Sequence, residues 1–476
     1  MNQNFIDGKF VSAAAAKRNI NPSNTDDIVG EYAQADHAQT EAAIAAAHGA
    51  FPDWALGNVQ LRSEMLERIG TELLARKEEL GRLLSREEGK TLAEGTGEVT
   101  RAAQIFKFYA AEVLRQRGER IASIRSGVDV EVTREPVGVI GIITPWNFPM
   151  AIPAWKIAPA LAYGNTVVFK PADLVPGSAW ALTEIISRSG LPPGVFNLVM
   201  GRGSVVGQAM LDSKLVNAIT FTGSVGTGKT VLTATAARMA KAQIEMGGKN
   251  PMLVLDDADL DVAVNCAVQS AFYSTGQRCT AASRIIVQKG IYNRFIDAVT
   301  RRMSLLRVDD ALKVGTDIGP VVDLAQLNQD LDYIKVGQQE GARLVTGGKQ
   351  VSRDTKGFYL TPALFADATN QMIIARHEIF GPVACVIPAN DYEEALAMAN
   401  DSEFGLSSGI CTTSLKYATH FRRHSESGMV MVNVPTAGVD YHVPFGGRKG
   451  SSYGSREQGT YAAEFFTTVK TAYTMA

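Results

Sequence analysis

Three segments hold residues whose types could carry out covalent and acid–base chemistry. Cys279 lies in Ser274-Thr-Gly-Gln-Arg278-Cys279-Thr280, where the adjacent Arg278 could lower the pKa of the thiol and raise its thiolate fraction. Glu245 precedes Gly-Gly just before an apolar run, so it is either a carboxylate at a helix end or a general base held on a sharp turn. Asn147 follows a predicted buried strand, where it either forms a turn or points its amide N–H at a developing oxyanion.

A glycine-rich segment could instead bind phosphate. Gly223-Ser-Val-Gly-Thr-Gly228-Lys229-Thr230 matches the G-x-x-x-x-G-K-[ST] pattern of P-loop NTPases, follows an apolar run and opens a helix. Leu253-Val-Leu-Asp256-Asp257 resembles the acidic strand that positions magnesium in those enzymes, although it follows after only one helix. In either interpretation, a glycine turn leading into a helix N-terminus can bind nucleotide phosphates through backbone N–H groups. Gly201-Arg-Gly203-Ser-Val-Val-Gly207 is a weaker dinucleotide signal, because it lacks G-x-G-x-x-G spacing.

Composition narrows the class of protein. At roughly 150 residues per domain, a chain of 476 residues suggests about three domains. It has 46% apolar and 20% charged residues and a net charge of −2, which excludes a disordered chain and gives no basic field for nucleic acid. Its four cysteines form no C-x-x-C pair, and no apolar run is long enough for a membrane span. We expect no secretory signal, because residues 1–10 lack a basic region followed by an apolar run. We expect a soluble cytoplasmic protein with free thiols.

Two histidines have the spacing of a metal pair. His420 and His424 are four residues apart on a predicted helix. No Glu lies between them, and the intervening Phe421-Arg-Arg423 favours a surface helix. We therefore predict no metal site, and we expect Cys411, in an apolar stretch, to be structural.

Periodicity predicts an α/β architecture. Residues 39–114 have the pattern of several amphipathic helices, and residues 128–133 alternate as a strand with one wet face. Short apolar runs then alternate with helix-length segments, which indicates a parallel sheet covered on both faces, and a second βα region follows from residue 265 to about 432. The predicted strands are 139–143, 166–169, 195–199, 218–221, 252–255 and 285–287. The apolar, aromatic segment 464–473 is expected to dock on another surface.

Six motifs, taken together, resemble the ordered signature set of the aldehyde dehydrogenase superfamily. They span most of the chain and occur in the family's order. The motifs are Pro145-Trp-Asn147-Phe-Pro149, Phe221-Thr-Gly223-Ser224, Glu245-Met-Gly-Gly-Lys249, Gly276-Gln-Arg-Cys279, Glu378-Ile-Phe380-Gly-Pro382 and Pro444-Phe-Gly-Gly447. The resemblance favours a dinucleotide over ATP at the glycine turn and makes Lys229 incidental.

The resemblance implies a role for each matching residue. Cys279 would attack an aldehyde, Asn147 and the backbone N–H of Cys279 would stabilise the oxyanion, and Glu245 would activate water to hydrolyse the thioester. Lys156 matches a family lysine near the active site; otherwise it is a solvent-facing helix charge. The implied cofactor-binding residues are Ile143, Trp146, Lys170, Asp173, Gly203, Gly207, Phe221, Gly223, Ser224, Glu378 and Phe380.

Cofactor preference stays open at this stage. Asp173 stands where a longer Glu is common in the family, three residues after Lys170. A carboxylate there accepts ribose hydroxyls and repels a 2′-phosphate, which favours NAD, but Lys170 can still pair with a phosphate. The expected cofactor is NAD or NADP.

Several segments are most similar to the α-ketoglutaric semialdehyde (2,5-dioxopentanoate) branch of the family. They are residues 170–177, 200–210 and 433–442. Such a substrate carries a carboxylate, so its pocket should hold a cation, and Arg278 is the nearest candidate. Position in the family pattern adds Phe148, Trp155, Tyr273 and Val439 to the pocket wall.

Other functions remain as alternatives. Succinate or glutarate semialdehydes, or a broad range of aldehydes, are possible substrates, although Tyr273 and Trp155 stand where succinate semialdehyde enzymes carry arginines. A CoA-acylating enzyme is disfavoured by Glu245, and a non-catalytic, crystallin-like role by the intact set of Cys279, Glu245 and Asn147. A P-loop NTPase is a remote alternative.

The resemblance also implies an architecture. We expect a Rossmann-like cofactor domain (residues 1–116 and 137–246), an α/β catalytic domain (247–446) and a β-arm for oligomerisation (117–136 and 447–476). An exposed strand edge is a liability unless another subunit covers it. We therefore expect a homodimer or homotetramer that acts on a small-molecule aldehyde, without nucleic acid or membrane partners.

Overall fold

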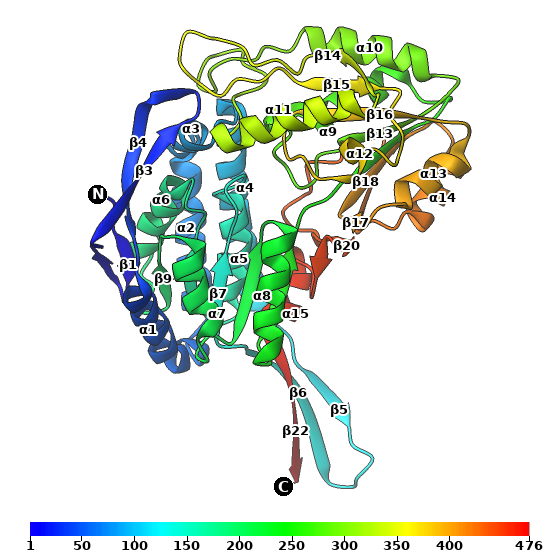
Figure 1. The fold of residues 1–476 in the computed structure, drawn as a ribbon. Coiled ribbons are helices and arrows are strands. Elements are labelled where there is room, and N and C mark those ends of the chain that lie inside the picture. Colours follow the sequence, from blue (N-terminus) through cyan, green and yellow to red (C-terminus); the bar gives the residue numbers. More distant parts are fainter. Residues whose placement is uncertain (476) are drawn as a thin grey trace.

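Two large β-sheets form the centre of the structure, a computed structural model that describes residues 1–475. The first has eight strands in the order β2-β1-β9-β8-β7-β10-β11-β21, and the second has seven in the order β14-β15-β16-β13-β12-β18-β19. They lie in two bodies that meet along one side (Figure 1). The strands of the first sheet are β1 (Asn4–Ile6), β2 (Lys9–Val11), β7 (Val139–Ile143), β8 (Thr166–Lys170), β9 (Phe196–Leu198), β10 (Ala218–Thr222), β11 (Lys241–Glu245) and β21 (Ser452–Tyr453). Those of the second are β12 (Pro251–Val254), β13 (Arg284–Gln288), β14 (Arg343–Thr346), β15 (Ala363–Ala366), β16 (Val383–Ala389), β18 (Ser407–Cys411) and β19 (Met429–Val432).

The centre of the first sheet is parallel and buried. β8, β7, β10 and β11 pair in parallel, and every residue of β8 and β10 is buried. Continuously apolar strands of this kind need helices on both faces. Because parallel strands end at one edge of a sheet, the residues that follow β7, β10 and β11 come together at that edge. The predicted α/β fold is confirmed.

Helices cover both sheets. Residues 39–114, predicted as amphipathic helices, form most of α1 (His37–Ala55), α2 (Val59–Ala75), α3 (Lys77–Glu88) and α4 (Leu92–Glu112). α5 (Ala151–Ala162) is buried throughout, because it is enclosed by α2, α4 and the first sheet. The other helices are α6 (Pro176–Ser187), α7 (Gln208–Asp212), α8 (Val225–Ala237), α9 (Leu260–Phe272), α10 (Tyr292–Ser304), α11 (Leu324–Gln339), α12 (Ile373–Arg376), α13 (Tyr392–Asn400), α14 (Leu415–His424) and α15 (Ala463–Phe466). No helix within residues 1–475 combines the length and apolar character needed to cross a bilayer.

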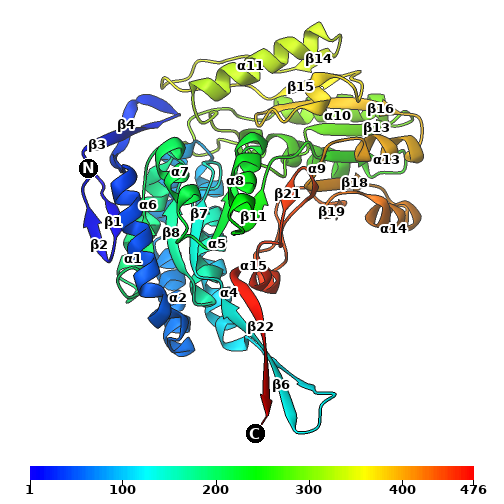
Figure 2. The same cartoon turned by 60° about the horizontal axis from the view of Figure 1, so that its bottom comes forward.

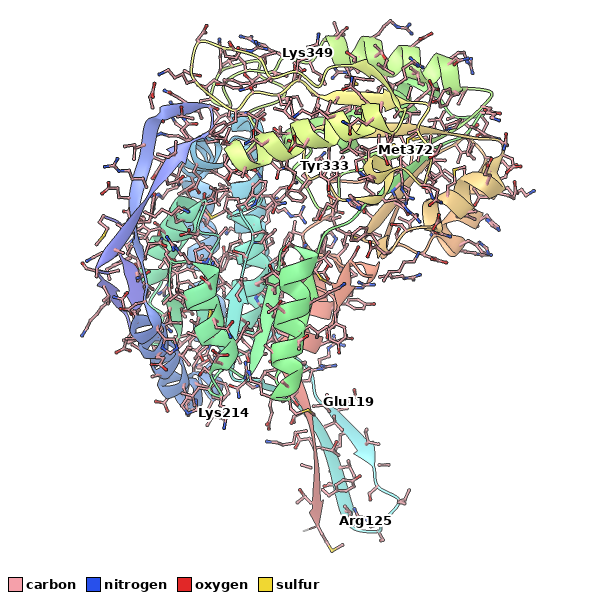
Figure 3. The ribbon with its side chains drawn as sticks, viewed as in Figure 1. Glu119, Arg125, Lys214, Tyr333, Lys349 and Met372 are labelled. Atoms are coloured by element: carbon pink, nitrogen blue, oxygen red, sulfur yellow. The ribbon has the colours of Figure 1, made fainter. Side chains whose placement is uncertain are left out.

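A three-stranded arm projects from the first body. β6 (Val128–Pro136) pairs antiparallel with β5 (Glu119–Ala122) on one side and with β22 (Thr467–Met475) on the other. The arm extends away from both sheets, with Glu119 and Arg125 along it (Figures 2 and 3). Residues 128–133 were predicted as a strand with one wet face, and residues 464–473 were predicted to dock on another surface. In the arm, residues 467–473 of the second segment pair with the strand that contains the first. Two smaller two-stranded sheets join β3 (Ala15–Asn21) to β4 (Asn24–Gln34) and β17 (Phe404–Gly405) to β20 (Arg448–Lys449).

The sheet topology contradicts the P-loop NTPase interpretation. The glycine turn follows β10 in the first sheet, whereas the acidic segment follows β12 in the second. The Asp257 carboxylate accepts hydrogen bonds from Thr412 Oγ1 at 2.7 and 2.8 Å, and Asp256 accepts from the Ile291 N–H at 2.9 Å. Both aspartates therefore hold turns together instead of facing the glycine turn, and Lys229 is exposed.

The two histidines with metal-like spacing stack on each other. Their ring centroids are 3.8 Å apart on α14. His420 Nδ1 lies 2.8 Å from the Tyr392 hydroxyl, and His424 Nδ1 lies 2.8 Å from the His420 carbonyl. Each ring therefore has a hydrogen-bonding partner within the protein, and the two rings pack together on the surface of the helix.

Candidate active site

Cys279 lies where two cavities meet. One has a volume of about 350 Å³ and the other of about 310 Å³, and Cys279 and Ile152 line both. The first cavity is mainly apolar and is enclosed by Phe148, Trp155 and Phe445, with α4 along one side. The second is bordered by the residues that follow β7, β10 and β11. A thiol at such a junction can contact two different bound molecules at once.

The loop that carries Cys279 has an unusual backbone. Between α9 and β13, Ser274, Thr275 and Gly276 have φ values of +51°, +56° and +66°. Such a left-handed run costs free energy unless surrounding contacts hold it. Glu94 Oε1 accepts hydrogen bonds from the Ser274 N–H at 2.7 Å and its hydroxyl at 3.0 Å. Gln277 Oε1 accepts from the Val322 N–H at 2.9 Å, so both ends of the run are fixed.

The Cys279 thiol is protonated in the resting site. Burial, followed by the nearby carboxylates of Glu378 and Glu245, raises its pKa to about 12. Arg278 and Cys279 attract each other electrostatically, but burial outweighs this attraction, so the thiolate fraction is not raised as the sequence suggested. The Arg278 guanidinium donates hydrogen bonds to the Gln269 and Ser270 carbonyls in the last turn of α9, so its charge is directed at the helix end. A base or a bound cation is required to generate the thiolate.

Two N–H donors lie near Cys279. Asn147 follows β7, and its Nδ2 donates to the Gln277 carbonyl at 3.0 Å, which leaves its second hydrogen available. The buried Lys90 ammonium donates to the Asn147 carbonyl at 2.6 Å and fixes that turn. Among the hydrogen bonds of residues 1–475, none uses the backbone N–H of Cys279. An amide side chain and a free backbone N–H can together bind an oxyanion.

Glu245 is the last residue of β11, not a helix end. Its side chain is buried and accepts a hydrogen bond from the Ser452 hydroxyl. Burial, and then the charge of Glu457, raise its pKa well above the ordinary value. The two glycines that follow allow a close approach. A Cβ on Gly247 would lie 1.9 Å from Glu378 Oε2, and the Gly248 N–H donates to Glu378 Oε1 at 3.0 Å.

Lys156 is buried, so the alternative of a solvent-facing charge is wrong. On α5, its ammonium pairs with Glu457, which lies 301 residues away, and donates to Thr220 Oγ1 at 2.7 Å. Glu457 and Lys156 both act electrostatically on Glu245, in opposite directions. The three groups form a buried charge network behind Cys279. Sequence reasoning missed Glu457 and Ser452, because both lie outside the six motifs.

The comparisons with known proteins agree with this geometry. Residues 10–472 match the aldehyde dehydrogenase family. The chain belongs to the aldehyde dehydrogenase family. An alpha-ketoglutaric semialdehyde dehydrogenase of Bacillus subtilis is 44% identical over 474 residues, 99% of this chain and 97% of the relative. An alpha-ketoglutarate semialdehyde dehydrogenase of Haloferax volcanii is 39% identical over 478 residues, 99% and 98% of the two chains. The crystal structure of betaine aldehyde dehydrogenase from Staphylococcus aureus in complex with NAD+ has a TM-score of 0.97 at 32% identity, covering 100% of this chain and 95% of the other.

Family membership confirms the predicted activity class. The protein is an oxidoreductase that acts on aldehyde groups. The resemblance inferred from the six motifs is therefore confirmed over the length of the chain. In this aldehyde dehydrogenase, two cavities meet at Cys279.

The second cavity of this aldehyde dehydrogenase has features that suit a dinucleotide. Its wall includes Trp146, Gly223, Ser224, Glu378 and Phe380. α8 begins just after Ser224, and no side chain caps its first N–H groups. Uncapped N–H groups at a helix start bind phosphate well. Only Oε1 of Glu378 is hydrogen bonded, so Oε2 remains for a hydroxyl donor.

The remaining predicted cofactor residues lie outside that cavity's wall. Ile143, Lys170 and Phe221 are at or near the ends of adjacent strands, and Gly203 and Gly207 bound a short helical turn. Burial lowers the pKa of Lys170 to about 8, and its ammonium donates to the Pro171 carbonyl at 2.8 Å. Lys17, on β3, forms an ion pair with Asp173 at 2.6 Å. Lys17 was not predicted, because it lies far from every motif.

The first cavity is lined by all of the predicted substrate residues. These are Phe148, Trp155, Tyr273, Arg278 and Val439. Sequence reasoning missed a row of charged residues that lines the same cavity, namely Lys90, Glu94, Glu98 and Arg101. The available signal was their spacing in α4, where residues 94, 98 and 101 share one face of a helix.

Proposed function

We propose that this enzyme oxidises α-ketoglutaric semialdehyde to α-ketoglutarate, with NAD or NADP as the hydride acceptor. The observation that carries the proposal is the position of Cys279 between a narrow apolar cavity and a second cavity that ends on uncapped helix N–H groups. The aldehyde enters the first cavity, and the dinucleotide the second. Cys279 is the nucleophile, Asn147 an oxyanion donor and Glu245 the general base.

The first step is attack of the Cys279 sulfur on the aldehyde carbon. The thiol gives its proton to the ionised form of Glu245, which releases it to solvent before the second step, and the carbonyl oxygen becomes an oxyanion. Asn147 Nδ2 and the backbone N–H of Cys279 are the two donors available to stabilise it, and one such donor contributes ~3–4 kcal/mol. Bound NAD or NADP supplies the acceptor for the hydride that leaves this adduct, which converts it to a thioester on Cys279.

The second step is hydrolysis of the thioester. Glu245 removes a proton from the attacking water, a general-base role that its raised pKa favours. Ser452 donates to the Glu245 carboxylate and orients it. Lys156 and Glu457 form a buried ion pair. Glu457 raises the pKa of Glu245 and Lys156 lowers it, so this pair helps to set how readily Glu245 takes up and releases a proton. We assign Lys156 to this network as a positioning residue.

The residues of the second cavity support binding of either dinucleotide. Trp146, Glu378 and Phe380 border it, and α8 presents its N–H groups beyond Gly223 and Ser224. Lys170 is the last residue of β8 and Asp173 follows it, beside the strands that lead to this cavity. The S. aureus relative was crystallised with NAD+, which supports NAD as a cofactor here. Since Lys17 already pairs with Asp173, that carboxylate is partly neutralised, and NADP stays an alternative.

Two lines of argument support the substrate. The B. subtilis and H. volcanii relatives are named for the semialdehyde of α-ketoglutarate and match nearly the whole chain. The first cavity combines an apolar wall with several charged groups, as a short aliphatic chain that ends in a carboxylate requires. A carboxylate-bearing aldehyde fits this combination better than an uncharged one.

The decisive experiment measures reduced nicotinamide by its absorbance. Purified enzyme is given α-ketoglutaric, succinic and glutaric semialdehydes and uncharged aldehydes of similar length, each with NAD and with NADP. We expect the highest kcat/KM for α-ketoglutaric semialdehyde and no turnover in Cys279→Ala. Equal or better turnover of uncharged aldehydes would refute the substrate assignment, and full activity in Cys279→Ala would refute the mechanism.

We propose three further properties on the same basis. The segments 1–116 with 137–246 form the cofactor domain, 247–446 form the catalytic domain, and β5, β6 and β22 form the oligomerisation arm. β21, which the sequence assigned to the arm, pairs with β11 in the first sheet. The arm supports assembly as a homodimer or homotetramer, because β22 leaves one edge unpaired within residues 1–475. A cytoplasmic location is supported by four cysteines that are all free thiols.

A further inference from the structure

One face of α4 lines the first cavity with charged groups. Glu94, Glu98 and Arg101 all border it. Both carboxylates have partners: Glu94 binds the loop before Cys279, and Glu98 accepts from the backbone N–H groups of Met150 and Ala151 at 2.9 and 3.0 Å. Both carboxylates therefore already accept hydrogen bonds from other parts of the protein. Arg101 is the exception on this face.

Arg101 has a desolvated positive charge without a carboxylate partner. Within residues 1–475 it forms no ion pair, and its one hydrogen bond runs from Nη2 to Gln458 Oε1 at 3.1 Å. Its guanidinium carbon lies 5.7 Å from the centre of the Trp155 ring, which also borders the cavity. Nε is buried with no acceptor. Nη1 has no acceptor either, and it is not among the buried atoms. A partly buried cation in this state is costly unless an anion binds beside it.

The charges of the other two cations of the cavity have more partners, although Nε of Arg278, like that of Arg101, is buried without an acceptor. Lys90 pairs with Glu98 at 2.7 Å, and its ammonium lies 3.8 Å from the centre of the Phe148 ring. The Arg278 guanidinium is held by the carbonyls of the last turn of α9, where the helix dipole offsets its charge. Arg101, with a single hydrogen bond to a neutral amide oxygen, is therefore the cation whose charge has the fewest partners, and it is not the one that the sequence indicated.

We propose that Arg101 binds the carboxylate of the substrate and thereby selects a carboxylate-bearing aldehyde. This inference rests on the proposed function, since it names the group that recognises the proposed substrate. A guanidinium can hold a carboxylate through two parallel hydrogen bonds, which fixes both the position and the direction of a bound chain. With the carboxylate held at Arg101, the aldehyde end of a short aliphatic chain extends along Phe148 and Trp155 towards Cys279.

The test compares charge selectivity, not activity alone. We measure kcat and KM for α-ketoglutaric semialdehyde and for pentanal, an uncharged aldehyde of the same chain length. In Arg101→Gln we expect the ratio of the two kcat/KM values to fall at least about 10-fold, mainly through a higher KM for the semialdehyde. Arg101→Lys, which keeps the charge but loses the bidentate geometry, should lie between the wild type and Arg101→Gln.

Arg278→Gln is the matched control. It removes the other arginine of the same cavity, and we expect the selectivity ratio to stay within about 3-fold while the melting temperature falls, because helix-end contacts are lost. An unchanged ratio in Arg101→Gln, or a collapse in Arg278→Gln instead, would overturn the proposal. If Arg101→Gln does not fold, the Arg101→Lys ratio decides the question alone.

The substrate preference of the wild-type enzyme tests the proposed function separately from the role of Arg101. If the wild-type enzyme shows no preference for the semialdehyde, the substrate assignment is wrong. Arg101 is then judged by inhibition of pentanal oxidation with glutarate, an unreactive dicarboxylate. A rise of at least about 10-fold in the glutarate inhibition constant in Arg101→Gln supports a carboxylate site, and an equal constant in both proteins refutes it.

Discussion

Burial decides the proton chemistry of the two reacting side chains. It raises the pKa of the Cys279 thiol to about 12 and that of Glu245 well above its ordinary value, so in both cases burial favours the protonated form. A general base works best when its pKa approaches the working pH, and burial moves Glu245 in that direction. The buried surroundings of Glu245, which include Ser452 and Glu457, are thus part of its function.

This shift predicts how the rate depends on pH. Because the pKa of Glu245 is raised, its basic form is lost as pH falls through that raised value, so kcat should rise with pH over a range that lies above the ordinary titration range of a glutamate. Glu245→Gln removes the base, and we expect its kcat to fall ~10²–10⁴-fold and to lose this rise. Stopped-flow and steady-state pH profiles measure both effects. The exposed Glu393→Gln is the control. A Glu245→Gln enzyme with the wild-type profile would show that another group is the base.

At the scale of elements, α4 holds the loop that carries Cys279. Its capping box joins Thr91 to Glu94, and the same Glu94 accepts from Ser274 in that loop. The loop itself packs against a neighbouring backbone. A Cβ on Gly276 would lie 2.3 Å from the Gly381 carbonyl oxygen, and its φ is +66°. The direction of the Cys279 thiol is set by three features together. They are the N-terminal cap of α4, the left-handed backbone of residues 274–276 and the contact of Gly276 with Gly381.

Gly276→Ala should therefore displace the nucleophile. The substitution combines a strained φ, which costs ~1 kcal/mol, with a backbone clash that no side-chain rotation relieves. We expect kcat/KM to fall at least about 10-fold and the melting temperature to drop by several degrees. Gly341→Ala is the matched control, because Gly341 has a φ of +91° but a Cβ added there would meet no atom within 4 Å. Equal losses of activity in both variants would show that strain, and not the contact with Gly381, is responsible.

At the scale of the whole molecule, the arm leaves apolar side chains in solvent. Every residue of β22 after Thr467 is exposed, including Val469 at 57% and Tyr473 at 61%. β22 is also an edge strand of its sheet, and Arg125 lies with it at the end of the projecting arm (Figure 3). Apolar residues on a free strand edge favour pairing with another chain.

Charges on this strand should disrupt assembly. We expect the double substitution Val469→Glu and Tyr473→Glu to shift the protein to a smaller species in light scattering, because carboxylates in an apolar interface are poorly solvated. Leu415→Glu, at a side chain that is 82% exposed on α14, serves as the control for an exposed apolar position outside the arm. A wild-type protein that scatters as a monomer would refute the proposed oligomer itself.

Much of the fold was predictable from local pattern. Apolar runs predicted β7, β8, β10, β12 and β13 within about two residues, since a strand buried on both faces must be apolar throughout. β11 was not predicted, because Lys241 and Gln243 interrupt its apolar character. Gln243 can be buried in this strand because its side chain donates hydrogen bonds to the carbonyls of Ser455 and Arg456. Those partners lie more than 200 residues away in the sequence, so nothing near Gln243 indicates them.

The sequence by itself indicated the class of chemistry, because six ordered motifs, among them those that contain Cys279, Glu245 and Asn147, resemble the signature set of aldehyde dehydrogenases. Only the tertiary structure decided which charges meet. Lys156 pairs with Glu457 across 301 residues, Arg278 turns to a helix end, and Arg101 stays unpaired beside the cavity. The physical reason is that periodicity specifies which face of an element is buried, whereas the partner of a buried charge depends on how distant elements pack.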